Sequence, residues 1–153
     1  MRQLPQAEKI TINILQSVDE IFQQSDVVVS SLTYADHDLL LDQQLMHPGT
    51  LLIPIHTRGF MNLDTAVDRV YCDDINQVSG FKYFKKFNSL AEVSDVLITP
   101  SLGRHNDDER IIVYNIGLAL HDIYFAAKIF EKMEESSMVE VNLGVPQEKV
   151  WYW

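Results

Sequence analysis

The stretch Asp26-Val-Val-Val-Ser-Ser-Leu32 decides the fold class of this chain. Its β-branched residues follow one another without interruption, and polar residues come only near the end, which is typical of a strand buried on both faces of a parallel sheet. A second apolar run, Thr50-Leu-Leu-Ile-Pro-Ile55, has the same character, although Pro54 is unusual inside a strand. Because parallel strands need long crossover connections, usually helices, these runs predict an α/β fold.

Further strands and helices alternate on both sides of these runs. Strands are predicted over residues 10–14, 69–73, 109–116 and 138–143. Helices are predicted over residues 38–46, over most of 75–97 and over 118–135. The motif Ser17-Val-Asp-Glu20 is a capping box and predicts a short helix that ends near Gln24. In the last helix, apolar residues at steps of three and four predict a stripe that faces a core: Ala119, Ile123, Ala126, Phe130 and Met133.

Composition and charge exclude several classes of protein. The chain has 153 residues, of which 46% are hydrophobic, and this suits one domain over residues 1–153. Its net charge of -10 repels phosphate backbones and anionic lipids, so we expect neither nucleic acid nor a membrane as partner. Apolar runs such as residues 51–55 are too short to span a bilayer, and residues 1–9 hold no apolar signal core. A cytoplasmic location is therefore expected.

The cysteine and the histidines give no sign of a metal site. Cys72 is the single cysteine and lies in an apolar strand pattern, so we interpret it as a buried structural thiol. The histidines have no ligand spacing with one another or with Cys72, and we predict no metal.

In a parallel sheet, ligands bind beyond the carboxyl ends of the strands. We therefore expect any site to draw on four segments, which are residues 30–34, 54–59, 73–75 and 115–118.

Two stretches resemble a known family, the ornithine cyclodeaminases and mu-crystallins. The first runs from Ser25-Asp-Val-Val-Val-Ser-Ser-Leu-Thr33 through Met46-His-Pro-Gly-Thr50 to Asn62-Leu-Asp64, and is similar to the central dinucleotide-binding region of that family. The second, Asp107-Asp-Glu-Arg-Ile-Ile-Val-Tyr-Asn-Ile-Gly117-Leu-Ala-Leu-His-Asp122, is similar to the segment by which the family's chain leaves that domain. The resemblance implies an incomplete, mainly parallel Rossmann-like domain over about residues 10–135, followed by a strand and tail over 136–153.

The resemblance covers only a carboxyl-terminal half, since family members are about twice as long. The chain has six glycines and no G-x-G-x-x-G motif, so the helix amino terminus that would hold a pyrophosphate is missing. The two missing strands would lie between residues 10–14 and 26–32, and their loss leaves a slot roughly 14 Å wide. We expect that the 10–14 strand shifts to close the slot, that a second polypeptide with the amino-terminal half fills it, or that another copy pairs with the open edge.

The resemblance also points to candidate site residues. It puts His56 where the family's enzymes have an acid/base aspartate, and an imidazole can also move protons near neutral pH. The alternative is that His56 is a hydrogen-bonded loop residue, and its neighbour Arg58 is either a carboxylate-binding or a solvated loop residue.

The remaining candidates would contact the cofactor, which the resemblance implies to be NAD or NADP. Ser31, Leu32 and Thr33 fall on the adenosine side, with contact mainly through their backbone. Asn115, Ile116 and Gly117 match the turn that approaches the nicotinamide, where a residue without a Cβ permits close approach. A plain strand-to-helix turn is the alternative for this second group.

Two functions remain open on the sequence. The chain is either part of an NAD(P)-dependent enzyme that acts on a small amino or imino acid, completed by an amino-terminal-half protein, or a catalytically inactive family member that serves as a binding or regulatory module. In both cases the open edge predicts that the chain works with a partner chain or as a homo-oligomer. We expect the isolated chain to bind the cofactor weakly or not at all.

Overall fold

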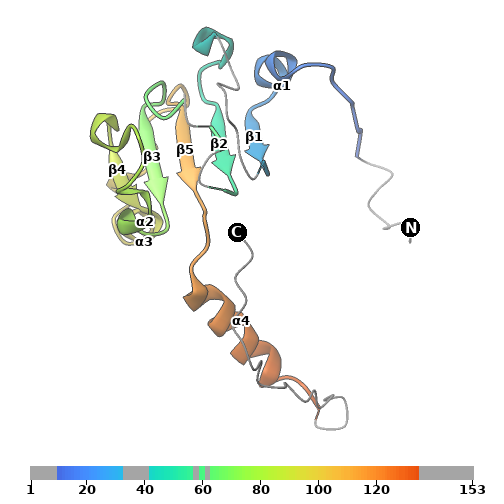
Figure 1. Cartoon of the computed structure of the whole chain (residues 1–153), viewed down its shortest axis with the longest axis vertical. Coiled ribbons are helices and arrows are strands. Elements are labelled where there is room, and N and C mark those ends of the chain that lie inside the picture. Colours follow the sequence, from blue (N-terminus) through green and yellow to red (C-terminus); the bar gives the residue numbers. More distant parts are fainter. Residues whose placement is uncertain (1–9, 33–41, 57–58, 61–62, 135–153) are drawn as a thin grey trace, which may run out of the picture. The chain divides into compact units, whose positions relative to one another are not determined.

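A five-stranded parallel sheet forms the centre of the described structure. The computed structural model describes residues 10–32, 42–56, 59–60 and 63–134. Its strands are β1 (Val27–Ser30), β2 (Leu51–Pro54), β3 (Arg69–Cys72), β4 (Leu90–Glu92) and β5 (Ile111–Tyr114). They lie in the order β1-β2-β5-β3-β4, and every neighbouring pair is parallel (Figure 1). The predicted α/β fold with a mainly parallel sheet is confirmed.

Short helices and 3-10 turns connect the strands. The α-helices are α1 (Val18–Gln24), α2 (Ile75–Val78), α3 (Val93–Ile98) and α4 (Ala119–Phe130). The 3-10 turns are η2 (Gln43–Leu45), η3 (Phe84–Lys86) and η4 (Pro100–Leu102). The predicted capping box is confirmed, because the hydroxyl of Ser17 accepts the backbone N–H of Glu20 at 3.2 Å and the Glu20 carboxylate accepts that of Gln16 at 3.1 Å.

The core is a row of apolar side chains across the sheet. Ile112 in β5 lies opposite Leu52 in β2 and Val70 in β3, and all three are fully buried. Phe22 of α1 closes the core at the β1 end, where its ring meets Phe60 edge-on with ring centres 6.0 Å apart. This packing explains why the central strands read as continuous apolar runs in the sequence.

Cys72 ends β3 inside this core. Its side chain is fully buried, and burial raises the pKa of the thiol to about 11. A thiol with a raised pKa and no access to solvent is a poor nucleophile, so the structural interpretation of Cys72 is confirmed.

The expected strand over residues 10–14 is absent, and this prediction is wrong. The segment is extended but belongs to no ladder, and the side chains of Ile10, Ile12 and Ile14 are 66%, 83% and 86% exposed. Alternation specified an extended backbone but could not supply a neighbouring strand to pair with.

The burial predicted for β1 on both faces is also wrong. Val28 and Ser30 are buried, whereas Val27 and Val29 are 49% and 55% exposed. β1 is the edge strand of the sheet, and no described helix covers the Val27 and Val29 face.

Residues 75–97 are less helical than predicted. They contain α2, η3 and most of α3, but also the edge strand β4, which pairs with β3 through residues such as Leu90 opposite Val70. Only three residues form β4, and so short a strand leaves no recognisable period in the sequence.

The structure divides the chain into two compact units, Met1–Gly117 and Leu118–Trp153. One domain over residues 1–153 stays a prediction. The sheet belongs to the first unit. α4 belongs to the second, and its apolar side chains, including Leu120, Ile123 and Phe130, are exposed. The predicted core-facing stripe on this helix is therefore not seen among the described residues. The predicted strand over 138–143 and residues 38–41 of the predicted helix over 38–46 lie outside them, and the described rest of that helix holds only the 3-10 turn η2.

Candidate functional site

The strand order brings all four expected site segments together at one edge, because the strands that precede them are neighbours in the order β1-β2-β5-β3. β1, β2 and β5 are neighbours in the sheet, so Ser31, His56 and Asn115 follow adjacent strand ends. The backbone N–H of Ile55 donates to the carbonyl of Ser30 at 2.9 Å, which extends the ladder to the rim. Leu32, His56 and Asn115 are all exposed there. Thr33 and Arg58, which the sequence also proposed, lie outside the described residues.

The turn from Asn115 to Gly117 is held in place by β3 and α2. The backbone N–H of Gly117 donates to the Asp73 carboxylate at 3.1 Å, and the side-chain amide of Gln77 donates to the Gly117 carbonyl at 3.1 Å. Gly117 has a φ of 87°, and a Cβ placed on it would meet no atom within 4 Å. Glycine is therefore required here by the backbone conformation rather than by crowding, and the space beside it is open.

Ile116 attaches the same turn to the hydrophobic core. Its side chain is half-buried and packs on the core, while Asn115 and Gly117 on either side are exposed. The sequence proposed this turn as a cofactor contact but gave no role to Asp73 or Gln77. The sequence did hold a sign of this contact, because Asp73 comes directly after a buried strand. A residue in that position lies at the carboxyl edge of the sheet, where its carboxylate can accept a hydrogen bond from a neighbouring loop.

The loop after β2 packs tightly on the strand ends. A Cβ on Gly59 would lie 2.9 Å from Oγ of Ser30 and 3.1 Å from Cβ of Pro54, so any side chain here would force these neighbours to shift. The N–H of Gly59 donates to the His56 carbonyl at 3.3 Å, which closes a turn. His56 is thus presented to solvent by a turn that is fixed against β1 and β2.

A buried polar pair lies beneath this edge. The hydroxyl of Tyr114, the last residue of β5, donates a hydrogen bond to the carboxylate of Asp64. Both side chains are buried, and Phe81 packs edge-on against the Tyr114 ring at 5.0 Å. Burial raises the pKa of Asp64 to about 7, against the lowering effect of the hydrogen bond from Tyr114. Burial and the neighbouring carboxylate also raise the pKa of Tyr114.

The edge offers little to a phosphate group. Arg58 is the only basic residue that the sequence places in the four segments, whereas Asp73 and Asp74 supply carboxylates. Asp74 is also used by the fold itself, because it caps α2 by accepting the N–H of Asn76 at 2.8 Å. Among the described residues, this edge therefore presents carboxylates and no lysine or arginine.

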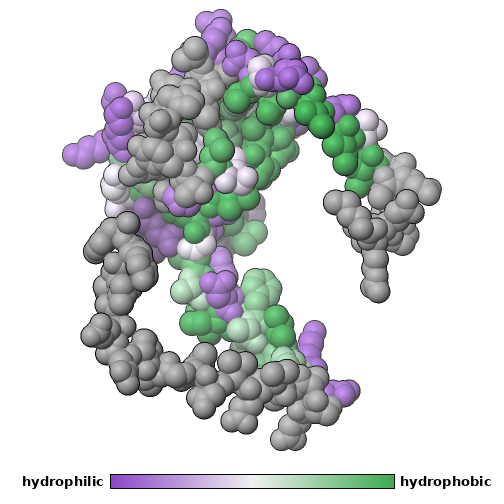
Figure 2. All heavy atoms as spheres, turned by 45° about the vertical axis from the view of Figure 1, so that its right-hand side comes forward, coloured by the Kyte–Doolittle hydropathy of each residue, from purple (hydrophilic) through white to green (hydrophobic). Residues whose placement is uncertain are grey.

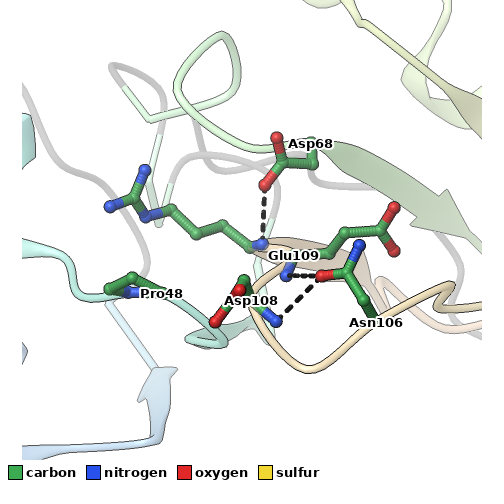
Figure 3. A pocket seen from close by; sticks show the side chains of 6 residues that line it. Pro48, Asp68, Asn106, Asp108 and Glu109 are labelled. Carbon is green, nitrogen blue, oxygen red and sulfur yellow. Dashed lines mark hydrogen bonds between the residues drawn. The ribbon is translucent and has the colours of Figure 1, made fainter.

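A cavity lies at the opposite edge of the sheet. It has a volume of about 580 Å³ and is lined by residues that precede the strands, namely Pro48, Asp68, Asn106, Asp108, Glu109 and Arg110. Figure 3 shows that its polar groups already bond to the surrounding loops: the Asp68 carboxylate accepts the N–H of Arg110 at 2.8 Å, and the Asn106 side chain accepts that of Asp108 at 2.9 Å. This cavity lies away from the carboxyl ends of the strands, where ligands of such sheets bind.

A smaller cavity of about 240 Å³ lies between α1 and β1. Val18, Ile21 and Phe22 of α1 form one wall, and β1 with Phe60 forms the rest. The hydroxyl of Ser30 is buried here and has no hydrogen-bond partner among the described residues. No group of three or more metal-ligating side chains occurs in the described part of the chain.

Comparisons with known proteins support the fold and part of the resemblance. No family model matches the chain. It is 29% identical over 134 residues to the nodulation efficiency protein NfeD of Rhizobium meliloti, a match that covers 83% of this chain and 42% of that protein. In structure it is similar to a probable ornithine cyclodeaminase from Bordetella pertussis Tohama I, with a TM-score of 0.63 at 19% identity over 75% of this chain and 41% of the other.

The structural match, together with the parallel sheet, shows a Rossmann-like α/β fold. The chain spans about two fifths of the length of each of these two proteins. None of the described helices is long and apolar enough to cross a membrane.

Proposed function

We propose that this chain is the carboxyl-terminal part of an NAD(P)-dependent enzyme that acts on a small amino or imino acid, and that a second polypeptide completes it. The observation that carries the proposal is the carboxyl edge of the sheet, where three candidate segments follow the adjacent strands β1, β2 and β5. The similarity in fold to a probable ornithine cyclodeaminase supports the same reaction class, as does the resemblance of the sequence. We place the complete enzyme in the cytoplasm, as the sequence predicts.

Each segment has a role in this proposal. Ser31, Leu32 and Thr33 contact the adenosine half of NAD or NADP, mainly through their backbone. Asn115, Ile116 and Gly117 border the nicotinamide, in the open space beside Gly117. When bound, the nicotinamide would supply hydride transfer, and His56 would move a proton to or from the substrate nitrogen or carbon.

An amino-terminal part is needed because the described residues hold no cradle for the pyrophosphate. Neither a glycine-rich turn nor a helix amino terminus follows β1, β2 or β5 at the edge in the described residues, except for α4, which belongs to the other compact unit. The isolated chain should therefore bind the cofactor no better than millimolar. Any cofactor that the isolated chain does bind should contact the carboxyl edge of the sheet.

Nuclear magnetic resonance tests this directly on the isolated chain. NAD and NADP at millimolar concentration should shift the amide signals of Ser31, Leu32 and Asn115 to Gly117. Amides at the opposite edge, such as Asp108 and Arg110, serve as the internal control and should not move. Shifts confined to the opposite edge would contradict the proposal.

A second candidate is a catalytically inactive binding or regulatory module. It is favoured by one departure from the family pattern, since His56 stands where the resemblance expects an acid/base aspartate. This candidate predicts the same weak binding at the same edge but no turnover after the amino-terminal half is supplied. Hydride transfer by the completed protein therefore distinguishes the two.

A further inference from the structure

The outer edge of β1 carries backbone groups that no described strand pairs with. The carbonyls of Asp26 and Ser30 point toward β2, where they accept the N–H groups of Leu51 at 2.8 Å and Ile55 at 2.9 Å. Because the backbone groups of successive strand residues point in alternate directions, Val27 and Val29 present their N–H and C=O groups to the opposite, outer side. Such an edge is a template for another strand.

An apolar cavity lies beside the same edge. The 240 Å³ space between α1 and β1 is lined by apolar side chains except for Ser30 and Ser31. It is large enough for one aliphatic side chain of a strand laid along β1. Such a strand would also bring backbone polar groups near the buried Ser30 hydroxyl, which has no partner among the described residues.

The chain itself carries a segment that suits this edge. Residues 10–14, Ile-Thr-Ile-Asn-Ile, are extended, uncharged and exposed, and they form no ladder. In an extended backbone the three isoleucines share one face, with Thr11 and Asn13 on the other. Figure 2 shows hydrophobic surface along the arm that leads from α1 toward the amino terminus. One molecule thus exposes both an unpaired strand and an unpaired edge.

We propose that two copies of this chain exchange these segments. Residues 10–14 of each copy add a strand to the outer edge of β1 in the other, and an isoleucine enters the cavity under α1. Because every copy offers one segment and one edge, the exchange is reciprocal and closes as a two-fold dimer. This inference goes beyond the proposed function: it describes the chain before a completing polypeptide takes the β1 edge, and that polypeptide would have to displace the exchanged strand.

A second copy fits the edge better than the segment of the same chain. The segment leads within a few residues into α1, which Phe22 fixes to the core against Phe60. Only twelve residues separate Ile14 from Val27, and seven of them form α1. A crossover between parallel neighbouring strands needs at least about a dozen residues. The twelve residues between Ile14 and Val27 are therefore barely enough for residues 10–14 to pair with β1 of the same chain. In the single chain the segment is exposed, and a second copy carries no such tether.

Two variants with matched chemistry test the exchange. Size-exclusion chromatography with light scattering should give twice the 17.6 kDa monomer mass for the wild type at micromolar concentration. Ile12→Asp should weaken dimerisation by about tenfold or more, because it would bury a charge at the new strand pair. The exposure of Ile12 means that this change leaves the folded monomer intact. Leu120→Asp puts the same charge on an exposed apolar residue of α4 and should leave the dimer unchanged.

Cysteine cross-linking gives a second, independent readout. A mixture of Asn13→Cys and Val29→Cys chains should form a disulfide between copies under mild oxidation, because both side chains would lie on the face of the sheet that α1 does not cover, while Val29→Cys alone should not. The buried Cys72 does not compete.

Four results would overturn the proposal: a wild type that stays monomeric, a dimer that Ile12→Asp leaves unchanged, a dimer lost in Leu120→Asp, or a disulfide between two Val29→Cys chains. None of these measurements involves a cofactor. The exchange and the proposed function can therefore fail separately.

Discussion

The hydroxyl of Tyr114 donates a hydrogen bond to the carboxylate of Asp64 inside the core. Tyr114 ends β5 and is followed directly by Asn115, while Asp64 belongs to the chain that follows β2 and His56. The pair therefore ties together two of the segments that we assign to the cofactor and the substrate. Its protonation state should affect the stability of the fold that carries the site.

Asp64 should make the protein less stable as the pH rises toward neutrality. Its pKa is about 7 in the folded chain against 3.8 for an ordinary aspartate, so the folded state holds a proton that the unfolded state has lost. The stabilising contribution is complete below pH 3.8, falls as the pH rises through 7 and is lost above it. Asp64→Asn should flatten this decline in urea midpoints measured between pH 5 and pH 8. The exposed Asp107→Asn is the control and should keep the wild-type slope.

Removing the donor of this pair should cost stability. Tyr114→Phe leaves the buried Asp64 without its hydrogen bond, which we expect to destabilise the fold by about 1–3 kcal/mol. The same change should raise the pKa of Asp64 further, because the hydrogen bond from Tyr114 lowers it. Tyr124→Phe removes a hydroxyl from an exposed tyrosine and should be nearly neutral. Equal unfolding free energies for the two variants would show that the hydrogen bond between Tyr114 and Asp64 does not stabilise the fold.

The sequence predicted most of the sheet and the edge at which we propose the site, but not the contacts that shape this edge. The apolar runs around Val28, Leu52 and Ile112 identified the strands, because a parallel sheet buries its central residues. The same reasoning overestimated the burial of Val27 and Val29, since a sequence run does not show which strand lies at the edge. Residues 10–14 were assigned as a strand from their alternation, although a strand also requires a partner.

The site contacts that the sequence missed join residues far apart along the chain. Asp73 bonds to Gly117 and Asp64 to Tyr114, separated by 44 and 50 residues. Spacing rules such as the capping box at Ser17 describe only neighbours within a helical turn, and they succeeded there.

Gly117 should be intolerant of a side chain although the space around it is open. Its φ of 87° costs an alanine roughly 1–2 kcal/mol. We therefore expect Gly117→Ala either to lower stability by this amount or to change the turn and release the bond to Asp73. Gly80→Ala is the matched control, because a Cβ there meets nothing within 4 Å and the backbone is not left-handed. Thermal unfolding of both variants measures the difference, and equal melting temperatures would contradict the account.

His56 should matter for turnover and not for cofactor binding. In an enzyme completed by its amino-terminal half, His56→Ala should lower kcat by the 10²–10⁴-fold typical of acid/base residues, with cofactor affinity nearly unchanged. His56→Asp restores the residue type that the resemblance expects and should keep much more activity. An unchanged kcat in His56→Ala would show that His56 takes no part in the reaction and is an ordinary loop residue.

Calorimetric titration of NAD(H) and NADP(H) into the isolated chain tests the central claim most directly. The account holds that the sheet supplies one side of a dinucleotide site, with the pyrophosphate cradle left to another polypeptide. It predicts a dissociation constant no tighter than millimolar for either cofactor. A dissociation constant of about 10 μM or tighter, some ~2.7 kcal/mol more favourable, would show that this chain holds the phosphates by itself and would contradict the account.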